Sequence, residues 1–125
     1  MESKFFICEK CGNIIGMIEP SGVPVVCCGQ KMTRLEAGVV EASREKHIPV
    51  VTVEGDTVKV SVGSVEHPMT AEHYISWVYL ETDKGGQRKA LTPDSAPSVV
   101  FALADENPLA VYAYCNLHGL WKAEI

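Results

Sequence analysis

Residues 49–63 read PVVTVEGDTVKVSVG, and this stretch decides the fold class. Valine alternates with other residues in both arms, Pro49 to Glu54 and Thr57 to Gly63, which is the period-two pattern of a half-buried strand. Gly55-Asp56 lies between the arms and is typical of a tight turn. The stretch therefore predicts a β-hairpin.

Further short runs on the C-terminal side of this hairpin have the same character. We expect strands over Tyr74 to Thr82, Gln87 to Leu91, Ser98 to Ala104, Ala110 to Cys115 and Leu120 to Glu124. About seven short strands at this spacing favour an antiparallel β-sandwich with an immunoglobulin-like outline. The one helix candidate is Leu35 to Lys46, and it is weakened by Gly38-Val39-Val40. The sequence thus predicts an all-β protein.

The N-terminal side differs in its metal-binding residues. Residues 1–36 hold four of the five cysteines and no histidine, whereas residues 37–125 hold all four histidines and the fifth cysteine. We therefore expect two domains with these bounds, each with its own site. Short strands are expected over Lys4 to Cys8, Asn13 to Glu19 and Val23 to Cys27. So short a domain cannot bury a self-sufficient core, and a metal is the natural way to stabilise it.

Composition limits the classes of function. The chain has 125 residues and a net charge of −5, which argues against binding nucleic acid or a membrane surface through bulk charge. No apolar run has the length of a membrane helix, and the N-terminus does not resemble a signal peptide. We therefore expect a cytoplasmic protein. In a reducing compartment, clustered cysteines bind metal more often than they form disulfides, and an odd number would leave one thiol unpaired.

The first candidate site consists of Cys8-x2-Cys11 and the adjacent pair Cys27-Cys28. Four thiolates in this spacing form a tetrahedral shell that suits zinc or iron. The adjacent pair cannot follow the relaxed geometry of a C-x2-C turn, so we expect a distorted tetrahedron. Spacing alone leaves two readings open. Zinc would make the site purely structural, whereas iron would let it carry one electron.

The second candidate site consists of His47, His67, His73, Cys115 and His118. These residues lie at predicted strand ends and in loops, where a scaffold brings together ligands from distant parts of the sequence. Four imidazoles and one thiolate suit a mid-row transition metal such as iron. With the imidazoles in one plane and the sulfur on one side, the opposite position stays open to a small molecule. A blue-copper site would use two histidines and one cysteine as ligands, so two of the four histidines would not bind the metal.

Several segments resemble the signature segments of the desulfoferrodoxins, the superoxide reductases with two iron centres. The segments that carry the resemblance to the second centre are Glu45-Lys46-His47-Ile48-Pro49-Val50, His67-Pro68-Met69, Glu72-His73-Tyr74 and Cys115-Asn116-Leu117-His118-Gly119. Cys8-x2-Cys11 with Cys27-Cys28 resembles the desulforedoxin-like first centre. One departure concerns Ala113, because some relatives carry an acidic residue there.

The resemblance implies that superoxide is reduced by one electron to hydrogen peroxide, with no dioxygen released, in oxidative-stress defence of an anaerobe or microaerophile. It implies iron in both sites, the first site being a desulforedoxin-like four-cysteine iron domain. It also implies a homodimer and an electron donor such as rubredoxin. The alternative function is that of a non-catalytic iron electron-transfer protein.

Two further residues are candidates for catalysis. Superoxide is an anion and the chain is net negative, so a local cation is needed, and Lys46 stands next to His47. Its ammonium would attract superoxide and help to deliver a proton. Glu45 would occupy the open position after oxidation and displace the product. We also expect the backbone N–H groups of Leu117 and His118 to bond the Cys115 sulfur.

Overall fold

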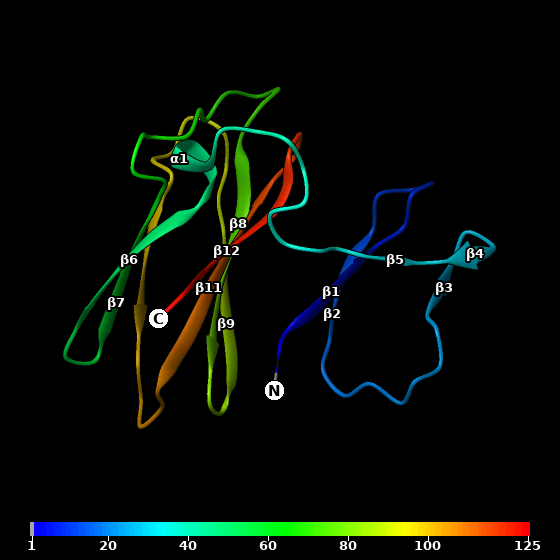
Figure 1. The fold of residues 1–125 in the computed structure, drawn as a ribbon, viewed down its shortest axis with the longest axis horizontal. Coiled ribbons are helices and arrows are strands. Elements are labelled where there is room, and N and C mark those ends of the chain that lie inside the picture. Colours follow the sequence, from blue (N-terminus) through cyan, green and yellow to red (C-terminus); the bar gives the residue numbers. More distant parts are fainter. Residues whose placement is uncertain (1) are drawn as a thin grey trace. The chain divides into compact units, whose positions relative to one another are not determined.

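The computed structural model describes residues 2–125, and its regular structure consists almost entirely of β-strands (Figure 1). The chain divides into two compact units, Met1–Glu36 and Ala37–Ile125. Within residues 2–125, no helix is both long and apolar enough to cross a membrane.

The first unit contains two small sheets. Strands β1 (Lys4–Ile7), β2 (Ile14–Met17) and β5 (Thr33–Arg34) form an antiparallel sheet in the order β2-β1-β5. Strands β3 (Val26–Cys27) and β4 (Gln30–Lys31) form a separate hairpin. Among the described residues of this unit, only Phe5, Cys8 and Met32 are buried. The unit therefore has almost no hydrophobic core of its own.

The second unit is a sandwich of two antiparallel sheets. It begins with the short helix α1 (Arg44–His47). One sheet has the order β10-β7-β6, made of β6 (Pro49–Glu54), β7 (Thr57–Val62) and β10 (Ser98–Ala102). The other has the order β12-β11-β8-β9, made of β8 (Ile75–Thr82), β9 (Gly85–Ala90), β11 (Pro108–Cys115) and β12 (Gly119–Glu124). The seven strands confirm the predicted all-β sandwich.

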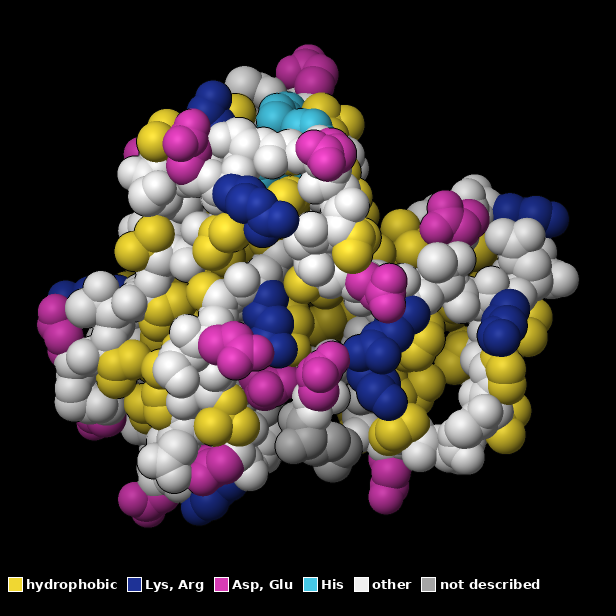
Figure 2. All heavy atoms as spheres, in the orientation of Figure 1, with side chains coloured by type: hydrophobic (Ala, Val, Ile, Leu, Met, Phe, Trp, Pro, Cys, Tyr) yellow, Lys and Arg dark blue, Asp and Glu magenta, His cyan; other side chains and the backbone are white. Residues whose placement is uncertain are grey.

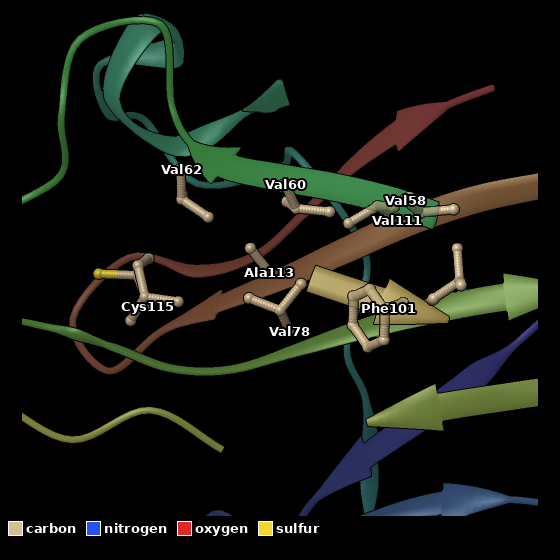
Figure 3. Packing of buried hydrophobic residues seen from close by; sticks show 10 residues of the cluster. Val58, Val60, Val62, Val78, Phe101, Val111, Ala113 and Cys115 are labelled. Carbon is tan, nitrogen blue, oxygen red and sulfur yellow. The ribbon is translucent and has the colours of Figure 1, made fainter. Parts of the chain in front are cut away.

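The core lies between these two sheets. Alternate residues of β7 point inward, and Val58, Val60 and Val62 pack with Phe101 of the neighbouring strand. The opposite sheet contributes residues of β8 and β11, namely Ile75, Val78, Leu80, Val111, Ala113 and Cys115. Figure 3 shows Cys115 at one end of this cluster, with its sulfur pointing away from the other labelled side chains.

Local sequence explains where the expected elements differ from the observed ones. The hairpin is as predicted, with Pro49 paired to Val62 and Glu54 paired to Thr57. The expected helix over Leu35 to Lys46 is wrong except at its end, because Gly38 takes a φ of +72° and only Arg44–His47 is helical. The expected strand over Val23 to Cys27 begins only at Val26, two residues after Pro24. Strands β4 and β5, of two residues each, were not expected.

The topology gathers residues from several chain segments at one end of the sandwich. Helix α1 leads directly into β6, and the first residue of β6, Pro49, pairs with the last residue of β7, Val62. The loop after β7 returns into β8 at Ile75, which is paired with Cys115 at the end of β11. Cys115 also pairs with Gly119 at the start of β12. Residues far apart in sequence therefore meet at this end.

Replacing Phe101 by alanine tests whether this core stabilises the second unit. Phe101 is fully buried, and its neighbour Val100 on the same strand is 51 % exposed. Phe101→Ala should lower the free energy of unfolding by about 3–5 kcal/mol, whereas Val100→Ala should change it by about 0.5 kcal/mol. The measurement is denaturant unfolding followed by tryptophan fluorescence, since both tryptophans, Trp77 and Trp121, lie in this unit. Equal effects of the two substitutions would contradict the assignment of the core.

Candidate metal centres

The structure brings the four cysteines of the first unit together. Cys8 follows β1, Cys11 lies in the next turn, and Cys27 and Cys28 lie where β3 turns into β4. The four sulfurs lie within 4.8 Å of one another, with 3.7 Å between Cys11 and Cys27 and 4.0 Å between Cys27 and Cys28. All five cysteines of the chain are free thiols.

Backbone conformation explains how adjacent residues serve one cluster. The N–H of Gly12 donates to the Cys8 carbonyl, which closes the C-x2-C turn. Cys28 has a φ of +53°, in the left-handed region that non-glycine residues rarely adopt. This turn lets its sulfur face the same centre as that of Cys27. Strained backbone of this kind is characteristic of binding sites.

Hydrogen bonding shifts the pKa values of three of these four thiols. Backbone hydrogen bonds, first from Cys11, lower the pKa of Cys8 to about 6. Cys28 shares its proton with the sulfurs of Cys11, Cys8 and Cys27, which raises its pKa to about 12. One thiolate thus forms readily and opposes ionisation of its neighbours. A metal ion would reverse this, and the all-sulfur shell fits zinc or iron.

The second cluster lies at the end of the sandwich described above. His47 ends α1, His67 and His73 lie in the loop between β7 and β8, and Cys115 and His118 flank the turn between β11 and β12. One ligand atom each from His47, His67, His73 and Cys115 lies within 4.8 Å of the others. The fifth residue, His118, joins them through its Nδ1, which is 3.2 Å from His47 Nε2 and 3.9 Å from Cys115 Sγ.

The four imidazoles form a closed ring. Neighbouring ring centroids are 4.6–5.0 Å apart and nearly perpendicular, in the order His47, His67, His73, His118. His47 and His73 face each other across the ring, with centroids 6.4 Å apart. The sulfur of Cys115 is close to the nitrogens and comes from the buried side. The structure thus brings together the four imidazoles and the sulfur that the sequence predicts.

Hydrogen bonds fix the tautomers of two histidines. His47 Nδ1 is 2.6 Å from the Ser43 carbonyl and His67 Nδ1 is 2.7 Å from the Pro68 carbonyl. A carbonyl only accepts, so each Nδ1 carries the proton and each Nε2 has a free lone pair. Burial lowers the pKa of His47 and brings that of His67 to about 4, which keeps both rings neutral.

These lone pairs provide a test of whether a metal fits. His47 Nε2 and His67 Nε2 are 3.2 Å apart with no proton between them, an arrangement that a shared cation would stabilise. With metal–nitrogen bonds of about 2.1 Å, two nitrogens at right angles lie about 3 Å apart. His73 Nε2 is also buried without a hydrogen-bond partner among residues 2–125. The donor set therefore fits a transition metal.

Cys115 is fully buried, and its sulfur is the donor nearest the core. Burial raises the pKa of its thiol, and hydrogen bonds from the backbone N–H groups of Leu117 and His118 act in the opposite direction. These are the two N–H groups that the sequence led us to expect. They stabilise a thiolate and would tune its bond to a metal.

The four histidines differ in their exposure to solvent. His47 and His67 are buried, whereas His73 and His118 are half-buried. Figure 2 shows histidine side chains reaching the surface of the second unit, with both basic and acidic side chains close by. A small molecule can therefore reach His73 and His118 from solvent.

Helix α1 carries the other two candidate residues. Lys46 is half-buried, and it contributes, after burial and His118, to lowering the pKa of His73. Glu45 is exposed, and its backbone carbonyl accepts bonds from Ser64 Oγ and the N–H of Val65. A Cβ atom at Gly63 would lie 2.6 Å from that carbonyl oxygen. The absence of a side chain at Gly63 thus lets the helix pack closely on the loop.

Trp121 contacts two of the histidines, a role that the sequence did not reveal. Its ring lies against that of His47, with centroids 4.9 Å apart, and its Nε1 donates to the His118 carbonyl at 3.1 Å. It is buried, as expected for a core residue. Its position three residues after His118 is the one signal that could have indicated the contact.

Two family models match this chain over most of its length. The model described as desulfoferrodoxin matches residues 39–124, and the one described as the N-terminal domain of desulfoferrodoxin matches residues 2–35. A desulfoferrodoxin from Nitratidesulfovibrio vulgaris is 40 % identical over 121 residues, which cover 97 % of this chain and 95 % of that protein.

Two solved structures that are similar to this chain are superoxide reductases. The crystal structure of the superoxide reductase from Treponema pallidum has a TM-score of 0.84 and 49 % identity, over 99 % of this chain and 100 % of that chain. The one-iron superoxide reductase from Giardia intestinalis has a TM-score of 0.57 and 31 % identity, over 65 % of this chain and 97 % of that chain.

Each cluster should bind metal without the other, because each lies within one compact unit. Cys28→Ser should lose most of the metal of the four-cysteine cluster and keep that of the second unit, since an all-sulfur shell loses one of its four ligands. His67→Ala should do the reverse. Metal analysis of the purified variants checks this. Loss of both metals from either variant would contradict two independent sites.

Proposed function

Since the chain belongs to the desulfoferrodoxin family, we propose that it is a superoxide reductase. Superoxide takes up one electron and two protons and leaves as hydrogen peroxide, with no dioxygen released. The observation that carries this proposal is the ring of four imidazoles, with the fully buried Cys115 beside it and two of its rings partly exposed to solvent. A structural metal site would be closed on every side.

The two clusters hold iron. In the second unit we assign the ligands as Nε2 of three histidines, Nδ1 of the fourth and one sulfur, contributed by His47, His67, His73, His118 and Cys115. Iron bound there would supply the single electron that superoxide needs, and a thiolate ligand from Cys115 would favour its donation. In the first unit the ligands are Cys8, Cys11, Cys27 and Cys28.

We assign Lys46 the task of attracting and protonating the substrate. The chain has a net charge of −5, so superoxide needs a local positive charge to approach. Lys46 is half-buried on the helix that ends in His47, and after burial and His118 its charge contributes to the lowered pKa of His73, which supports a position near the histidine ring. Its Nζ would hold the incoming anion and give a proton, directly or through water, to the reduced product.

We assign Glu45 the task of closing the site after turnover. Glu45 is exposed on α1 and lies two residues before His47, so its carboxylate is free to turn toward the open side. A carboxylate oxygen is a good ligand for a hard ferric ion and would compete with peroxide for that position. Glu45 would thus assist product release.

The remaining assignments concern the organisation of the chain. Residues 1–36 form a desulforedoxin-like iron domain that stores one electron, and residues 37–125 form the superoxide reductase domain. Electrons come from an external carrier such as rubredoxin, and the chain works as a homodimer in the cytoplasm, in defence against oxidative stress. The match of separate family models to residues 2–35 and 39–124 supports this division.

Peroxide yield distinguishes this function from that of a plain electron carrier. The half-buried His73 and His118 favour access for a substrate, which a carrier does not need. Reduced protein should therefore convert one superoxide to one hydrogen peroxide for each second centre that becomes oxidised, and it should release no dioxygen. Oxygen-electrode and peroxide assays measure this. Dioxygen release at half the superoxide consumed would indicate dismutation instead and would contradict the proposal.

Replacing Lys46 tests the electrostatic role. Lys46→Ala should slow the second-order reaction with superoxide about tenfold at low ionic strength and weaken its salt dependence, because the local attraction is lost. Lys59→Ala is the matched control, since Lys59 is exposed on β7 and its removal changes the net charge equally. Pulse radiolysis at several salt concentrations gives the rates. If both variants react at the rate of the parent, Lys46 has no part in substrate capture.

A further inference from the structure

Asn116 connects the segments that carry three of the metal-binding residues. It is the first residue after β11, between Cys115 and His118, and it is exposed. Its Oδ1 accepts a hydrogen bond of 2.9 Å from the N–H of Tyr74, and its Nδ2 donates one of 2.9 Å to the Glu72 carbonyl. Its backbone N–H also donates to the Tyr74 carbonyl at 3.2 Å. The side chain thus binds the peptide groups on both sides of His73.

His73 differs from the two buried histidines in how its ring is held. His47 and His67 are fixed by bonds from Nδ1 to a backbone carbonyl. The bonds of His73 to described residues are made by its backbone, which is paired with Thr70, and its Nε2 is buried without a partner. The direction of this ring therefore depends on the position of its backbone.

We propose that Asn116 is the positioning residue for His73. By holding residues 72 and 74, its amide fixes the backbone of His73 against the turn that carries Cys115 and His118. Three of the five ligands then move as one body. This inference rests on the proposed iron site of the second unit, and it gives Asn116 no contact with the substrate. The two hydrogen bonds of the Asn116 amide take the place of the ring hydrogen bond that usually orients a ligating histidine.

The natural control lies at the other end of β11. Asn107 immediately precedes that strand, and its backbone N–H and Nδ2 donate to the Asp83 carboxylate at 2.9 and 2.7 Å. Asn107 therefore makes a comparable connection between two loops, far from the histidines along the strand. Asn107→Ala therefore shows how the loss of such a connection affects the folded unit when the connection is not next to a metal ligand.

The test is the rate at which iron leaves the second unit of the full, iron-loaded chain. Asn116→Ala should release this iron to an excess of chelator about 10- to 100-fold faster than the parent, the range found when groups that orient metal ligands are removed. The visible absorption of the oxidised second centre follows the loss, and the four-cysteine centre in the same sample is an internal reference. The electron paramagnetic resonance spectrum of the oxidised second centre should also change, because the direction of one imidazole changes.

A second variant protects the test against a failure to fold. Asn116→Asp keeps the size of the side chain and an acceptor for the Tyr74 N–H, but it has no donor for the Glu72 carbonyl. Its negative charge favours a bound cation, so faster release of iron from this variant has to come from lost positioning. Tryptophan fluorescence checks that each variant is folded.

The possible outcomes distinguish a failure of the proposed role of Asn116 from a failure of the proposed function. Faster release from both Asn116 variants, with Asn107→Ala within about twofold of the parent, is the expected result. If folded Asn116 variants release iron at the parent rate and their spectrum is unchanged, the proposed role of Asn116 is overturned and the proposed function is left intact. The same conclusion follows if Asn107→Ala accelerates the release of iron equally. A parent chain whose second unit holds no iron would instead overturn the proposed function.

Discussion

The second unit is built around imidazole lone pairs that point at one another. Each Nδ1–carbonyl bond of His47 and His67 forces the proton away from Nε2, and these bare nitrogens are 3.2 Å apart. His73 adds a third buried nitrogen with no partner among residues 2–125. Such an arrangement costs free energy in the absence of a cation and is stabilised by one. The hydrogen bonds that orient these rings thus also leave unprotonated nitrogens close together, an arrangement that a bound metal ion stabilises.

The two units provide for a metal in different ways. The second unit has a full hydrophobic core, so its sandwich can hold the ligands at the ends of strands and leave one side open. The first unit buries only Phe5, Cys8 and Met32 among its described residues, and hydrogen bonds to the neighbouring sulfurs raise the pKa of Cys28. There the metal is part of what holds the fold together. A closed sulfur shell suits storage of an electron, and an open histidine shell suits a substrate.

Much of this was predictable from sequence, for identifiable reasons. Alternating valines around Gly55-Asp56 gave the hairpin with the bounds of β6, because one face of this strand pair is buried. Cysteine and histidine spacing gave both clusters, since those residue types have few other uses in such patterns. The helix over Leu35 to Lys46 was overestimated, because a positive φ at Gly38 interrupts it. The order of the histidines around the ring and the contacts of Trp121 and Asn116 could not be predicted, because they depend on how distant strand ends meet.

The central claim is that Cys115 and four histidines surround one iron, with sulfur opposite the open side. The most direct measurement is the visible absorption spectrum of oxidised Cys115→Ser, taken together with its iron content. Iron should stay bound to the second unit, and the sulfur-to-iron charge-transfer band of this centre should be lost. An iron-loaded variant with the same spectrum as the parent would contradict the account, because the sulfur would then not be a ligand.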